Sequence, residues 1–110
     1  MPKHKTPDDR SQEFTMNLGG VIQIITGEIV GQVGKDPTQE MVYVFVKGEA
    51  GGNYLRRIGT CSCCNEVEED WIMFNFWEEL EERLEEQPEK LWLLKIIAGR
   101  MCGEKPSELH

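Results

Sequence analysis

Long apolar runs and a secretory signal are both missing from this sequence. None of its apolar runs approaches the roughly 20 residues that a membrane-spanning helix needs. Residues 1–17 lack the apolar stretch of a signal peptide. We therefore expect no membrane association and a cytoplasmic location. Thiols are reduced in that compartment, so the cysteines are not expected to form a disulfide framework.

Catalytic motifs are missing as well. The only histidines, His4 and His110, lie at the two ends of the chain, which excludes a histidine-based acid–base pair inside a domain. The sequence contains no G-x-S-x-G, P-loop, dinucleotide-binding or H-E-x-x-H motif. The glycine-rich residues 48–52 precede an expected strand rather than a helix, which favours a hairpin loop over a phosphate site. We expect a protein without enzymatic activity.

Basic residues are few, and acidic residues are concentrated in one segment. Residues 1–60 carry seven acidic and seven basic side chains, whereas residues 61–90 carry eleven acidic and two basic ones, a net charge of −9. Arg56 and Arg57 are the only adjacent basic pair outside the termini, so direct nucleic-acid binding is not expected. The acidic segment either attracts a basic partner or solvates the exposed side of a helix, and the sequence leaves both interpretations open.

The apolar residues occur in dense blocks that suit one small domain. We expect a flexible leader over residues 1–17 and a single α+β domain over residues 18–110. Residues 21–33 are rich in β-branched side chains and predict a strand that is buried on both faces and bent at Gly27 and Gly31. Further strands are predicted over residues 41–47, 54–60 and 67–74. The expected fold is a curved antiparallel sheet of three to four strands followed by a C-terminal helical hairpin.

Two helices are predicted after the strands. Asn75 and Glu78 have the spacing of a capping box, and the first helix is expected to continue through the glutamate-rich residues that follow. The second helix is expected from Pro88 to about Cys102. Its main apolar stripe is formed by Leu91, Leu94, Ile97, Ala98 and Met101. Trp92 and Ile96 lie roughly opposite this stripe, so we expect a partner or a second copy of the chain to cover them.

The cysteines are the most reactive group of residues in the sequence. Cys61, Cys63 and Cys64 lie within a predicted turn, and Cys102 lies at the end of the last helix. Four thiolates can complete a tetrahedral zinc site, although the spacing lacks the two cysteine pairs of common zinc modules. The other interpretations are a regulatory thiol, without a neighbouring histidine to activate it, and ordinary packed cysteines.

These observations favour a non-enzymatic protein-interaction protein that binds a basic protein surface, such as an acidic inhibitor or a nucleic-acid mimic of the phage or mobile-element type. Self-association through the second helix is also expected. The candidate partner-binding residues are Glu78, Glu79, Glu82, Glu85, Glu86, Trp92 and Ile96. The alternative is a small zinc-stabilised domain that uses Cys61, Cys63, Cys64 and Cys102; no other cofactor is expected.

Overall fold

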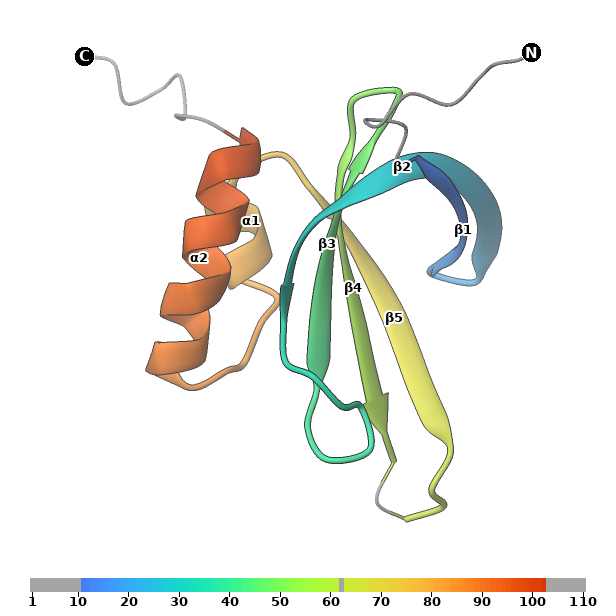
Figure 1. The fold of residues 1–110 in the computed structure, drawn as a ribbon, viewed down its shortest axis with the longest axis vertical. Coiled ribbons are helices and arrows are strands. Elements are labelled where there is room, and N and C mark those ends of the chain that lie inside the picture. The colour runs from blue at the N-terminus through green and yellow to red at the C-terminus, as the bar shows by residue number, and fades with distance from the viewer. Residues whose placement is uncertain (1–10, 62, 103–110) are drawn as a thin grey trace.

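A five-stranded antiparallel sheet and two helices make up the computed structural model, which describes residues 11–61 and 63–102 (Figure 1). Each strand pairs with its neighbour in the sequence, so the order in the sheet is β1-β2-β3-β4-β5. The strands are β1 Gln12–Leu18, β2 Val21–Val33, β3 Val42–Gly48, β4 Asn53–Thr60 and β5 Val67–Phe74. The helices are α1 Trp77–Glu81 and α2 Pro88–Cys102. The α+β class, the curved antiparallel sheet and the C-terminal position of the helices are confirmed.

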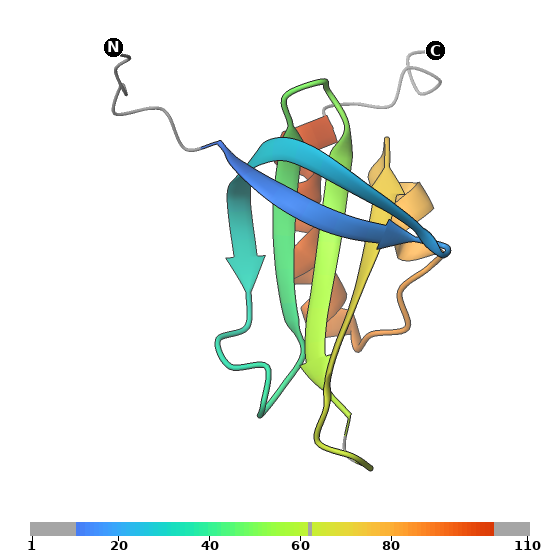
Figure 2. The ribbon, with the colours of Figure 1, turned by 90° about the vertical axis from the view of Figure 1, so that its right-hand side faces the viewer.

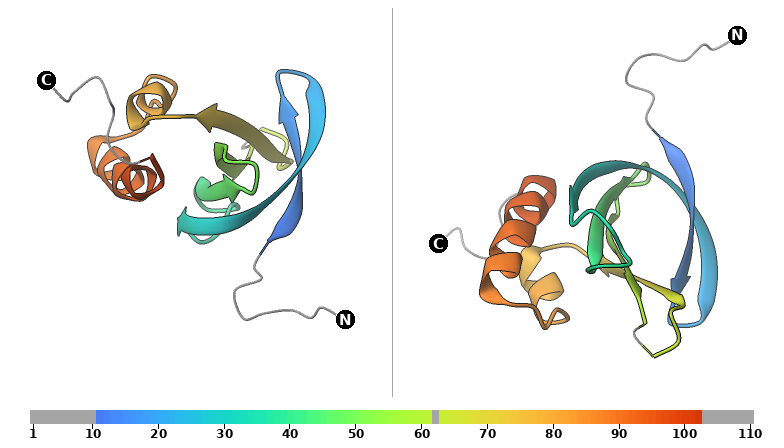
Figure 3. Two further views of the ribbon diagram at one scale, coloured as in Figure 1. Left: turned by 90° about the horizontal axis from the view of Figure 1, so that it is seen from above. Right: turned by 60° about the horizontal axis from the view of Figure 1, so that its bottom comes forward.

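The sheet is covered on both faces by different parts of the chain. The β1–β2 hairpin curls over one face, and the two helices lie side by side against the other (Figure 2, Figure 3). Strand β3 is central and buried on both sides, because successive side chains of a strand point in opposite directions. Tyr43 and Phe45 join the core under the helices, whereas Val42, Val44 and Val46 join the core under the hairpin. This division of β3 into two apolar faces was predicted from its sequence.

Strand β1 is an additional strand and corrects the expected leader. Its range, Gln12–Leu18, lies mostly inside the segment 1–17 that we expected to be flexible, so that expectation is wrong from residue 12 onwards. Residues 1–10 lie outside the described residues. The cause is local: Phe14 and Met16 alternate with polar residues and are buried, with the Phe14 ring 5.8 Å from that of Trp71 on β5 in an edge-on arrangement.

Strand β2 bends at its glycines as predicted, but the expected burial on both faces is wrong. The pairing with β3 shifts register between Ile29 and Gly31, and a Cβ on Gly27 would lie 2.6 Å from the Lys47 carbonyl oxygen. Ile22 and Ile24 are 67% and 66% exposed. The first half of β2 leaves the central sheet together with β1, and no layer of the described chain covers the outer side of that hairpin.

Helix α1 is shorter than predicted. It ends at Glu81, although we expected it to continue through the glutamates up to residue 86. Like charges four residues apart, as in Glu78 with Glu82 and Glu82 with Glu86, destabilise an exposed helix by about 0.2–0.5 kcal/mol per pair and favour the early end. The predicted capping box is also wrong: the N-cap is Phe76, which makes no side-chain cap hydrogen bond. The Asn75 backbone N–H instead donates to the Glu79 carboxylate at 2.7 Å.

Helix α2 has the bounds predicted from the sequence. Leu94 and Ala98 are fully buried against the sheet and α1. Neither helix in the described part of the chain is long and apolar enough to cross a membrane.

Candidate functional site

The first candidate site is the side of α2 that faces away from the sheet. Trp92, Leu93 and Ile96, which we call the outer face of α2, are 64%, 45% and 38% exposed. Trp92 and Ile96 are one helical turn apart and were expected on this side. Leu93 was missed by the sequence interpretation, although its position between Trp92 and Leu94 on a helical projection was sufficient to place it beside this face.

Close contact with the sheet holds α2 in place. A Cβ on Gly31 of β2 would lie 2.7 Å from Cγ2 of Ile97, so the absence of a side chain at Gly31 lets the helix approach the strand. About two turns nearer the start of α2, the Lys90 ammonium lies 3.4 Å from the Glu40 carboxylate in the loop between β2 and β3. Because α2 is held by these contacts, the side chains of its outer face lie on a rigid helix, and little conformational entropy is lost when they bind a partner.

The glutamates of α1 and the following turn have different environments. Glu78, Glu82 and Glu85 are exposed, and we call them the glutamate ridge. Glu79 is also exposed, but its carboxylate accepts the Asn75 backbone N–H. Glu86 is half-buried beside the Tyr43 hydroxyl. Burial and, after it, the Glu86 carboxylate raise the pKa of Tyr43 well above its ordinary value. Glu79 is thus tied to the start of α1 by a hydrogen bond, whereas Glu86 lies beside the Tyr43 hydroxyl without hydrogen-bonding to it.

Part of the acidic segment is neutralised by β4. Arg56 forms an ion pair with Glu69, and Arg57 forms a two-point pair with Asp70 on the neighbouring strand. The Arg56 guanidinium also lies 5.6 Å from the centre of the Trp71 ring. These contacts engage the guanidinium groups of both adjacent arginines. The remaining negative charge belongs mainly to α1, the turn after it and the β4–β5 turn.

The second candidate site is the turn between β4 and β5, which carries three cysteines. The Cys61 backbone N–H donates to the Glu66 carbonyl oxygen at 2.8 Å, and the Asn65 N–H donates to the Cys61 carbonyl oxygen at 2.8 Å. Asn65 has the left-handed backbone conformation, with φ of 61°, which the short Asn side chain tolerates well. These contacts close a tight hairpin turn.

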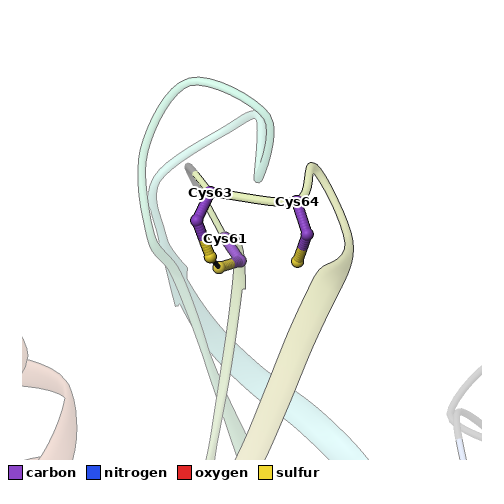
Figure 4. Close-up of side chains that lie close together, drawn as sticks. All are labelled: Cys61, Cys63 and Cys64. Carbon is purple, nitrogen blue, oxygen red and sulfur yellow. Dashed lines mark hydrogen bonds between the residues drawn. The ribbon is translucent and has the colours of Figure 1, made fainter.

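The turn brings three sulfur atoms together. The Sγ atoms of Cys61, Cys63 and Cys64 all lie within 4.8 Å of one another, and those of Cys61 and Cys63 are 2.8 Å apart (Figure 4). We call these residues the thiol trio. Hydrogen bonding by Cys63 lowers the pKa of the Cys61 thiol, and the same interaction raises the pKa of Cys63. Cys61 and Cys63 therefore form a thiolate–thiol pair as the pH rises.

Cys102 is not part of this cluster. The Asn53 side-chain amide lies 3.9 Å from the Cys102 Sγ atom, at the start of β4, whereas Cys61 follows the end of that strand. At about 3.3 Å per residue, the eight residues from Asn53 to Cys61 span about 26 Å. Burial raises the pKa of the Cys102 thiol. The structure thus brings together three of the four candidate metal ligands, and Cys102 packs with the core under the helices.

Comparisons with known proteins add no assignment to this geometry. A scan against protein-family models, a search of curated proteins and a search of solved structures each found no match.

Proposed function

We propose that this protein is a non-enzymatic interaction protein that binds a basic protein surface through the outer face of α2 and the glutamate ridge beside it. The observation that carries the proposal is the exposure of Trp92, at 64%, on a helix whose opposite side is firmly packed. Tryptophan is strongly enriched among the residues that dominate binding energy at protein interfaces. Ile96 and Leu93 enlarge the same apolar surface.

Charge supports a basic partner. Helices α1 and α2 lie side by side against the same face of the sheet (Figure 3), so the segment that carries the glutamate ridge is next to the helix that carries the outer face of α2. Residues 78–86 include six glutamates and a single basic residue, Arg83. Such a surface raises the encounter rate with a basic protein and repels nucleic acid. The apolar face would supply most of the affinity and the glutamates most of the on-rate.

The proposal is tested by comparing captured proteins across matched variants. Trp92→Ala removes the largest exposed side chain of α2, and Ile24→Ser removes an equally exposed apolar side chain from β2 as the control. We expect a basic protein from the native host to be captured by the wild type and by Ile24→Ser, and its affinity to fall at least about 30-fold with Trp92→Ala, as for an interface hot spot of about 2 kcal/mol.

The glutamates are tested with the partner identified in that capture. Replacing Glu78, Glu82 and Glu85 by glutamine should slow association and flatten its salt dependence. Unchanged association would contradict the role of the ridge. If no captured protein depends on Trp92, the docking role of α2 is refuted.

A second copy of the chain is the competing occupant of the outer face of α2. Light scattering distinguishes it: a dimer that Trp92→Ala converts to a monomer would show that this face serves self-association and would overturn the proposal. A monomer that still requires Trp92 for capture supports it.

A further inference from the structure

The thiol trio is a set of ligands complete within four consecutive residues. Its three sulfur atoms lie between 2.8 Å and 4.8 Å apart. Three thiolates around one metal ion at about 2.3 Å would have sulfur–sulfur separations of about 4.0 Å in a trigonal plane, a value that the observed range includes. Rotation of the Cys61 and Cys63 side chains, whose Sγ atoms are 2.8 Å apart, would bring that separation towards this value.

We propose that the β4–β5 turn binds one Cu(I) ion in a three-coordinate site formed by Cys61, Cys63 and Cys64. Thiolates are soft ligands that select Cu(I), zinc and iron–sulfur clusters. Cu(I) accepts trigonal coordination by three thiolates. Structural zinc instead requires a closed set of four ligands. No histidine or carboxylate among the described residues joins the thiol trio, and Cys102 lies at the far end of β4.

The surroundings of the turn suit a bound cation. Glu66 and Glu68 are exposed next to the cysteines, and the charge of Glu68 contributes to the raised pKa of Cys63. Binding replaces the thiol protons, which pass to solvent, while copper and sulfur keep their oxidation states. The acidic neighbours attract the metal ion electrostatically and stay outside its coordination shell, since carboxylates are hard ligands that Cu(I) does not favour.

Exposure and sequence spacing indicate a site for metal exchange and not for stabilising the fold. Cys63 and Cys64 are exposed and Cys61 is half-buried, so a competing thiol can reach the metal. The ligands span residues 61–64 alone, so the unfolded chain retains all of them. Metal that binds the folded and the unfolded chain almost equally adds little to the free energy of unfolding. This separates the site from a zinc-stabilised domain, which would lose its structure with its metal.

The test is an anaerobic competition titration of the reduced full chain with Cu(I) and the chromophoric chelator bathocuproine disulfonate. We expect one Cu(I) per chain with the ultraviolet absorption of copper–thiolate bonds. Cys61→Ser, Cys63→Ser and Cys64→Ser should each weaken binding at least about tenfold, since losing even an outer-shell partner costs about that much. Cys102→Ser is the matched control and should bind like the wild type. X-ray absorption should report three sulfur ligands.

Several results would overturn the proposal. The first is that the chelator removes all the copper from the wild-type protein. The second is that Cys102→Ser weakens Cu(I) binding as much as the three turn variants do. A tetrahedral Co(II) spectrum together with stoichiometric zinc that resists the chelator would replace the Cu(I) site by a four-coordinate one. Recovery of a Cys61–Cys63 disulfide from protein equilibrated with reduced glutathione would indicate a redox pair instead. Circular dichroism of each serine variant checks that the fold is intact.

Discussion

Gly31 of β2 lies against Ile97 of α2, so Gly31→Ala tests how closely the helix packs on the strand. A Cβ at this position would be 2.7 Å from Cγ2 and 3.1 Å from Cδ1 of Ile97. Non-bonded carbon atoms prefer separations of about 3.5–4.0 Å. Ile97 cannot easily turn away, because a β-branched side chain in a helix has one strongly preferred χ1 rotamer.

The expected cost of Gly31→Ala combines two opposing effects. Overpacking of this kind destabilises by about 1–3 kcal/mol. Replacing glycine by alanine also restricts the unfolded chain, which stabilises by about 0.4–1 kcal/mol when the native backbone tolerates the change. Gly31 has no positive φ, so the backbone itself does not oppose alanine. We expect a net loss of about 1–2 kcal/mol in the free energy of unfolding.

Urea unfolding of a double-mutant cycle with Ile97→Ala isolates the contact. Ile97→Ala removes all three Ile97 atoms near the Gly31 Cβ position. Because Ile97 is half-buried, the substitution should cost about 1–3 kcal/mol, less than the roughly 2–5 kcal/mol typical of a fully buried isoleucine. In that background, Gly31→Ala should become neutral or stabilising. Gly99→Ala is the matched control: no atom lies within 4 Å of its Cβ position, and we expect a gain of up to about 1 kcal/mol from helix propensity. Equal destabilisation by Gly31→Ala in both backgrounds would refute the reasoning.

Three further predictions concern ionisable groups. The Thr38 hydroxyl lowers the pKa of Asp36. The stability from this contact is therefore present above the ordinary Asp pKa and is lost as the pH falls through the lowered value. Thr38→Ala should raise the Asp36 pKa in an NMR titration, and an unchanged pKa would contradict this assignment. Tyr43→Phe should change the free energy of unfolding by less than about 1 kcal/mol, because the buried hydroxyl makes no hydrogen bond to a described residue. The raised Tyr43 pKa means that wild-type stability should fall above about pH 10 more steeply than that of Tyr43→Phe, and parallel curves would refute the assignment. In metal-free protein, mass spectrometry should find Cys61 alkylated by iodoacetamide at neutral pH faster than Cys102, and the reverse order would contradict the pKa directions.

Several features with short-range causes were predicted correctly. The alternation of residues 42–46 predicted the two faces of β3, and Pro88 predicted the first residue of α2. The thiol trio was recognisable for the same reason, since three cysteines within four residues cannot be far apart. Trp92 and Ile96 were found exposed, because the helical period alone places them opposite Leu94.

The incorrect predictions depended on contacts between distant segments. Phe14 and Met16 provide too few apolar residues to indicate a strand until β2 pairs with them and Trp71 packs against them. Ile22 and Ile24 have the composition of a buried strand, yet their exposure depends on where the hairpin crosses the sheet. The early end of α1 is a local exception: like-charge repulsion between glutamates four residues apart favours it, and a count of helix-forming glutamates does not include this effect.

The sequence by itself determined the order of β2 to β5 and of the two helices, the apolar side of α2, the acidic segment and the grouping of three thiols, because each depends on residues a few positions apart. The tertiary structure decided which acidic residues are paired, which side of β2 is uncovered and which cysteines share a site. Cys102 is the clearest case. Its distance from the turn depends on the length of β4 and on where α2 packs against the sheet, and neither can be obtained from the spacing of cysteines along the chain.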